Sequence, residues 1–142
     1  MLLVDANVLI HAVNADSPNH RESRQWLDAA LQGGEPVGFA WVALLAFFRV
    51  ATNPAVLSDP LTVDEATDQV RAWVGAPGAI VVEPSPRHAD ILAGLLSGTG
   101  TAGNLVNDAH LAALATEHAG QIVTFDRDFG RFPGVRSRRP TP

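Results

Sequence analysis

Three aspartates stand at positions where a folded chain brings polar side chains together. Asp5 follows the short apolar run 2–4, Asp126 follows the apolar run 121–125, and Asp108 lies in the first turn of a helical pattern over 107–118. In open α/β sheets, ligands bind beyond the carboxyl ends of the strands, near a switch in strand order. We therefore expect Asp5 and Asp126 to be neighbours at such a switch, with Asp108 facing the same crevice.

Clustered carboxylates repel one another and need a partner. Two like charges about 4 Å apart repel by roughly 4 kcal/mol at an effective dielectric constant near 20. Either one carboxyl group keeps its proton or a cation lies between them. A ligand set made only of oxygen favours magnesium or manganese over zinc. Such a metal activates water, orients a phosphate and stabilises the charge that develops when a phosphodiester is attacked.

Each aspartate also has a purely structural interpretation, and spacing alone does not choose between the two. An aspartate that follows a strand often serves as a loop residue or a helix cap, and Asp108 would favour its helix dipole in any case. Asp128, two residues after Asp126, is either a further ligand or a turn residue.

The surrounding pattern alternates strands with helices. Apolar runs predict strands at residues 2–4, 37–40, 79–82 and 121–125, and helical patterns cover 8–13, 17–31, 41–52, 62–74, 85–96 and 107–118. Ser17-Pro18 and Ser85-Pro86 are typical helix starts, and Thr62 with Glu65 has the spacing of a capping box. The alternation predicts an α/β fold with a mostly parallel central sheet covered by helices on both faces.

Composition favours a single domain over residues 1–142, because the length suits one core and neither a repeat nor a dividing linker is visible. Cysteine is absent, which excludes disulfides, thiolate zinc sites and a cysteine nucleophile. Neither a signal peptide nor an apolar run long enough to span a bilayer is found, so a cytoplasmic location is expected.

The charge of the chain is unevenly distributed. The net charge is −5, which argues against broad nucleic-acid binding by a basic surface. All ten basic residues are arginines, and five of them lie within residues 127–142. Residues 131–142 therefore read as a basic C-terminal tail, and the sequence leaves open whether it is merely solvated, steers phosphates or contacts a partner.

Four segments resemble motifs of the PIN-domain family, in particular the VapC-type toxins of VapBC toxin–antitoxin systems and their mycobacterial-like subgroup. The segments are LVDANVLI at 3–10, FRVATNP at 48–54, NLVNDAHLAALA at 104–115 and VTFDRDF at 123–129. Each motif is weak alone, but together they cover nearly the whole chain in the family's order. The resemblance implies a PIN fold and a magnesium-dependent endoribonuclease, with manganese as a substitute and tRNA or rRNA as substrate. It also implies a VapB-type antitoxin as partner and a homodimer.

The resemblance also assigns roles to individual residues. Asp5 and Asp108 correspond to the primary metal ligands, and Asp126 completes the acidic pocket directly or through water. Asn7 would orient the site by hydrogen bonding. Thr124 would do likewise, or would only pack and hydrogen-bond within its strand.

The chain departs from the family at Ala46, where a glutamate is usual. Alanine there is either natural variation or an engineered inactivating substitution. It raises the alternative of a catalytically impaired PIN-like protein that acts as an RNA- or antitoxin-binding module. Glu117, more than two turns beyond Asp108, is expected at the core edge or surface rather than as a replacement ligand.

Two further alternatives concern Arg49 and Asn7. Arg49, in the apolar helix 41–52, is either a phosphate contact, a charge partner for the acidic cluster, or an arginine whose stem packs while its head reaches water.

A phosphatase of the haloacid dehalogenase type also places an aspartate after its first strand. It normally has a second acid at the position of Asn7, and this counts against that class.

Overall fold

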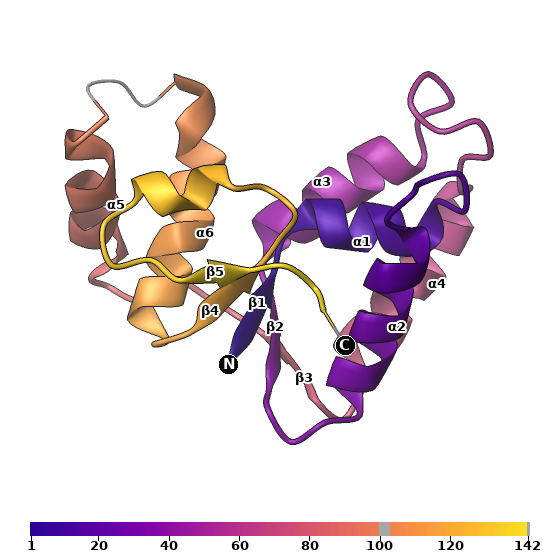
Figure 1. Cartoon of the computed structure of the whole chain (residues 1–142), viewed down its shortest axis with the longest axis horizontal. Coiled ribbons are helices and arrows are strands. Elements are labelled where there is room, and N and C mark those ends of the chain that lie inside the picture. Colours follow the sequence, from indigo (N-terminus) through magenta and orange to yellow (C-terminus); the bar gives the residue numbers. More distant parts are fainter. Residues whose placement is uncertain (100–102, 142) are drawn as a thin grey trace.

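A five-stranded parallel sheet forms the centre of the described chain (Figure 1). The structure is a computed structural model, and it describes residues 1–99 and 103–141. The strands are β1 (Leu2–Val4), β2 (Val37–Phe39), β3 (Ala79–Val81), β4 (Gln121–Val123) and β5 (Ser137–Arg138), arranged in the order β3-β2-β1-β4-β5. Every neighbouring pair is parallel. The strand order reverses at β1, which therefore has β2 on one side and β4 on the other.

Helices connect the strands and cover both faces of the sheet. They are α1 (Ala6–Val13), α2 (His20–Leu31), α3 (Trp41–Ala51), α4 (Val63–Val74), α5 (His88–Ser97) and α6 (Val106–Glu117), with 3-10 turns η1 (Gly103–Leu105) and η2 (Asp128–Arg131). The predicted α/β fold is confirmed. Figure 1 shows α1–α4 grouped on one side of the sheet and α5 and α6 on the other.

The alternation of side chains along the strands divides the core in two. Leu2 and Val4 point into the cluster formed with α1–α4, whereas Leu3 points into the cluster formed with α5, α6 and η2. Gly38 of β2 lies on the second side, where an added Cβ would come within 2.8 Å of a Val82 methyl group. The sheet is thus packed on both faces, as a parallel sheet requires.

Two helices begin two residues after the proline predicted as their first helical residue, for the same reason. The hydroxyl groups of Ser17 and Ser85 each accept a hydrogen bond from the backbone N–H two residues on, at 3.1 Å in both cases. This local bond makes a turn that precedes the helix rather than capping it. Consequently α2 begins at His20 and α5 at His88.

Helix α3 is less buried than its apolar sequence predicts. Its inward residues Ala43, Leu44 and Phe47 are buried, but Trp41 and Leu45 are 48% and 58% exposed. Burial in the core therefore applies to one side of this helix only. Across the described residues, none of the helices has both the length and the apolar character needed to cross a bilayer.

The segment predicted as a basic tail contains the edge strand β5, which was not foreseen. The N–H groups of Ile122 and Thr124 donate to the carbonyl oxygens of Arg136 and Arg138, at 2.9 Å each. A two-residue edge strand that carries arginine has no apolar pattern, and this explains why the sequence did not reveal it. Beyond β5 the chain runs on toward α2, and Pro140 is buried.

Candidate active site

The pairing of β1 with β4 brings Asp5 and Thr124 together at the carboxyl ends of these strands. Val4 is in register with Val123, and the N–H of Asp5 donates to the Val123 carbonyl at 3.0 Å. Asp5 also caps α1, because its Oδ1 accepts from the N–H of Ala6 at 2.7 Å. The strand order reverses at this point, where open α/β sheets bind their ligands.

Asn7 and Thr124 fix the Asp5 carboxylate by hydrogen bonds. The Thr124 hydroxyl donates to Asp5 Oδ2 at 2.7 Å, and Asn7 Nδ2 donates to the same oxygen at 3.0 Å. Asn7 Nδ2 also donates to the Thr124 hydroxyl at 3.0 Å, and its Oδ1 accepts from the N–H of Phe125 at 3.2 Å. These bonds join α1 to the end of β4.

Asp126 and Asp128 lie on the loop that follows β4. The Thr124 hydroxyl accepts from the N–H of Asp126 at 3.0 Å, and Asp126 Oδ1 accepts from the N–H of Asp128 at 2.8 Å. The exposed Asp128 pairs with Arg131 Nη2 at 3.0 Å. Asp128 therefore takes part in the η2 turn, whereas Asp126 stays half-buried beside the Asp5 network.

Asp108 meets Asp5 across a cavity of about 180 Å³ between α1, α3 and α6. The lining residues are Asp5, Ala6, Val42, Ala43, Ala46, Asn107, Asp108 and Leu111. Ala46 thus lies on the wall of the acidic cavity, at the place where the family's glutamate was expected. All three α3 residues of the wall, Val42, Ala43 and Ala46, are apolar.

The two carboxylates that face this cavity hold protons more tightly than usual. Burial raises the pKa of Asp5; hydrogen bonds from Thr124 and Ala6 act against this, and the negative charge of Asp126 adds to it. Burial also raises the pKa of Asp108, together with the charges of Asp5 and Asp126, while Arg131 acts in the opposite direction. Raised pKa values are expected where carboxylates share a site without a cation.

The donor set fits a hard divalent cation. Asp5 and Asp108 offer carboxylate oxygens to one cavity, and an ion between them would compensate the negative charge that burial and neighbouring aspartates make unfavourable. Among the described residues, no three acidic or histidine side chains converge with metal-ligand spacing. The structure therefore places Asp5 and Asp108 on one cavity, with Asp126 close enough for its charge to raise the pKa of both.

Arg49, His110 and Glu117 lie apart from the cavity. Arg49 is exposed in the last turn of α3, and no ion pair of the described residues includes it. His110 points to α5, where its Nδ1 lies 2.8 Å from His88 Nε2. Glu117 is bonded to His88 at 2.8 Å and also lies away from the acidic cavity, so it does not replace the glutamate absent at position 46.

Two site residues were missed by sequence reasoning. Asn107 lines the cavity next to Asp108, and Arg131 acts electrostatically on Asp108. The proximity of Asn107 to Asp108 in the sequence was an available signal. For Arg131 there was none, because its position depends on how η2 folds back over α6.

A comparison with known families matches residues 2–135 to the PIN domain. The chain belongs to the PIN-domain family. Within it, the chain is 56% identical to Ribonuclease VapC37 of Mycobacterium tuberculosis over 140 residues, covering 99% of this chain and 97% of that protein. It is 39% identical to Ribonuclease VapC31 of the same species, covering 99% of both. This PIN domain is therefore an enzyme of the VapC ribonuclease group, whose nucleases generally depend on a metal.

Solved structures agree with the PIN fold. VapBC2 from Rickettsia felis, bound to a promoter DNA fragment, superposes with a TM-score of 0.71 at 15% identity, covering 97% of both chains. VapC20 of Mycobacterium tuberculosis, a toxin that cleaves the sarcin–ricin loop, gives a TM-score of 0.69 at 16% identity, covering 96% of this chain and 99% of that one. At these identities the likeness concerns the fold alone.

Proposed function

We propose that this PIN domain is a magnesium-dependent endoribonuclease that cleaves tRNA or rRNA, and the toxin of a type II toxin–antitoxin pair. The observation that carries the proposal is the acidic cavity, where Asp5 and Asp108 face each other with raised pKa values beside Asp126. Membership of the VapC ribonuclease group gives the substrate class. Mn²⁺ is expected to substitute for Mg²⁺.

In this proposal each site residue has a separate task. Asp5 and Asp108 would hold the ion, with Asp126 completing the pocket directly or through water. The bound ion supplies an activated water and stabilises charge on the attacked phosphodiester. Asn7 and Thr124 keep the Asp5 carboxylate in one orientation through their shared hydrogen bonds. Asp128 supports the Asp126 loop. Arg49 would contact a phosphate of the RNA.

The partners follow from relatives and from one exposed surface. Fold relatives have been solved as VapBC complexes, so we assign a VapB-type antitoxin as the inhibitor. The outward side of α3, with Trp41 and Leu45 exposed, is assigned to a homodimer interface. We place the protein in the cytoplasm and treat residues 1–142 as one domain.

The decisive experiment measures cleavage of a mixed tRNA and rRNA pool by the purified protein free of antitoxin. Cleavage is expected with Mg²⁺ or Mn²⁺, not with EDTA, and not in an Asp5→Ala variant. Asp90→Ala is the matched control, because Asp90 is an exposed aspartate in the first turn of α5, on the other side of the sheet from α1. Cleavage that survives both EDTA and Asp5→Ala would refute the metal-dependent site.

Ala46→Glu tests what the missing glutamate does. The substitution adds a carboxylate to the cavity wall and is expected to tighten Mn²⁺ binding about tenfold, since a full ligand contributes at least as much as an outer-shell partner. Mn²⁺ titration measures this directly, whatever happens to activity. An unchanged affinity would mean that position 46 does not face the ion.

A further inference from the structure

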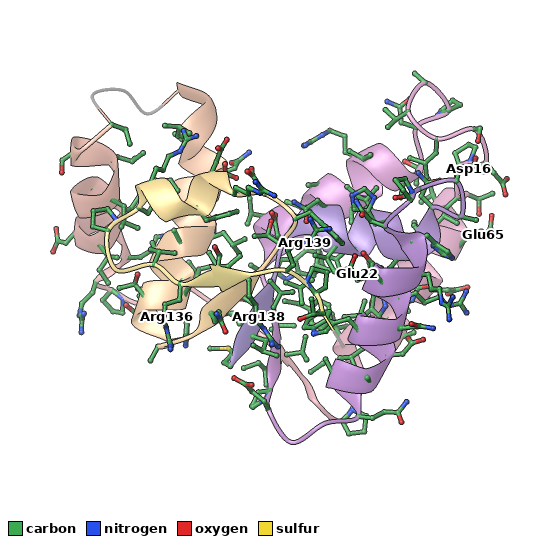
Figure 2. The ribbon with its side chains drawn as sticks, in the orientation of Figure 1. Asp16, Glu22, Glu65, Arg136, Arg138 and Arg139 are labelled. Carbon is green, nitrogen blue, oxygen red and sulfur yellow. The ribbon has the colours of Figure 1, made fainter. Side chains whose placement is uncertain are left out.

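The C-terminal segment crosses from the sheet edge to α2 and passes beside the acidic site on its way. Figure 2 shows Arg139 from this segment close to Glu22 of α2. Arg139 Nη2 lies 3.6 Å from Glu22 Oε2, and the next residue, Pro140, is buried. We call residues 137–141 the strap. It is tied at one end by β5 and at the other by α2.

The strap covers Phe125, the residue immediately before Asp126. The guanidinium carbon of Arg139 lies 4.8 Å from the centre of the Phe125 ring. His11 of α1 meets the same ring edge-on, with the centroids 5.1 Å apart. Phe125 therefore contacts both a cation from the strap and an imidazole from α1.

The backbone on either side of Phe125 is also fixed. The Thr124 N–H donates to the Arg138 carbonyl at 2.9 Å, and the Phe125 N–H donates to Asn7 Oδ1 at 3.2 Å. After Asp126 the chain enters the exposed turn around Asp128. Besides the bonds of Asp126 with Thr124 and Asp128, the anchorage of the preceding residue therefore contributes to the position of its carboxylate.

We propose that Arg139 is a positioning residue: by clamping Phe125 to α2 it holds Asp126 beside the Asp5 hydrogen-bond network. The inference rests on the proposed function, because it treats Asp126 as part of the metal site. Arg139 is 51% exposed, so its ion pair alone contributes little to stability. Its stacking on an aromatic ring is an independent attraction that a solvated tail arginine would lack.

The neighbouring arginine provides a matched control. Arg138 is also exposed and belongs to the same strap, yet none of the described side chains pairs with its guanidinium group. Arg138→Ala keeps the carbonyl that accepts from Thr124. It therefore removes one positive charge near the site and leaves the clamp intact.

The test compares Arg139→Ala, Arg139→Lys and Arg138→Ala in the full-length protein. Mn²⁺ affinity without RNA is measured by the loss of the free-ion EPR signal, and amide hydrogen exchange is followed at residues 124–128. Arg139→Ala is expected to weaken Mn²⁺ binding about fivefold and to speed exchange at Phe125 and Asp126 by a similar factor. Arg139→Lys should restore most of both values, and Arg138→Ala should change neither.

Kinetics separate this role from a phosphate contact. A positioning residue lowers kcat for RNA cleavage with little change in KM. If Arg139→Ala raises KM and leaves Mn²⁺ affinity and exchange unchanged, Arg139 binds RNA and the proposal is overturned. If the wild-type protein neither cleaves RNA nor binds Mn²⁺, the proposed function fails, and the exchange difference between Arg139→Ala and Arg138→Ala still decides whether the clamp exists.

Discussion

Helix α6 carries two carboxylates that the fold treats in opposite ways. Asp108, in its first turn, accepts no hydrogen bond from the residues that the structure describes, and its pKa is raised by burial and by neighbouring aspartates. Glu117, in its last turn, accepts from the Ser85 N–H at 3.1 Å, from the Ser85 hydroxyl and from His88. Although its side chain is only 3% exposed, these bonds outweigh the effect of burial and lower its pKa.

The difference separates a binding site from a structural bond. Glu117 joins α6 to the start of α5, and His88 is bonded in turn to His110. The Glu117 carboxylate is therefore stabilised by hydrogen-bond donors within the protein. Asp108 has no such partner among the described residues, so we expect its charge to be available to a ligand and to lower the stability of the metal-free protein. Perturbed carboxylates without partners are typical of functional sites.

Asp108→Asn should produce the largest effect and the clearest separation of function from stability. RNA cleavage is expected to fall at least about a hundredfold, because even outer-shell partners of metals contribute up to that factor. The metal-free variant should nevertheless melt about 2–4 °C higher, since a buried repulsion is removed without loss of a described hydrogen bond. Activity assays and thermal denaturation in EDTA measure the two effects. A lower melting temperature would contradict the comparison.

Glu117→Gln should lower stability and leave the metal site unchanged. One acceptor is lost among the donors from Ser85 and His88, and the free energy of unfolding is expected to fall by about 1–3 kcal/mol. Mn²⁺ affinity should stay unchanged. Glu83→Gln, at an exposed glutamate, is the control for urea denaturation. Equal losses in the two variants would mean that the Glu117 network contributes nothing to stability.

The stabilities of these two variants should depend on pH in opposite directions, and this effect should be smaller than the two above. Raised pKa values at Asp5 and Asp108 give stability that is full below the ordinary value of 3.8 and is lost as pH rises through the folded-state pKa. The lowered pKa of Glu117 gives stability that is present above 4.5 and is lost as pH falls through its folded-state pKa. Relative to wild type in EDTA, Asp108→Asn should gain stability with rising pH and Glu117→Gln should lose it. Parallel curves from urea denaturation would contradict the assignment.

The sequence predicted the part of the site that depends on local motifs. Asp5 and Asn7 follow β1, Thr124 and Asp126 follow β4, and these strand ends lie together because β1 and β4 are neighbours in the parallel sheet. Ala46 was likewise expected beside the acidic cluster, and it lines the cavity. Local pattern was sufficient for Asp5 and Asp126, whereas the family resemblance supplied Asn7, Thr124 and position 46.

Contacts between distant segments could not be predicted in the same way. Glu117 was expected at the core edge or surface, and its bonds with Ser85 and His88 depend on how α5 packs on α6. The stacking of Arg139 on Phe125 depends on β5, whose two residues carry no apolar alternation. Such contacts follow from tertiary packing, which no local pattern encodes.

The pairing of β1 with β4 has a consequence for folding during synthesis. Asp5 leaves the ribosome early, but the Thr124 hydroxyl that orients it is made 119 residues later. A domain generally folds as a unit. We therefore expect a nascent chain to lack an oriented Asp5 carboxylate until β4 has been made and has paired with β1.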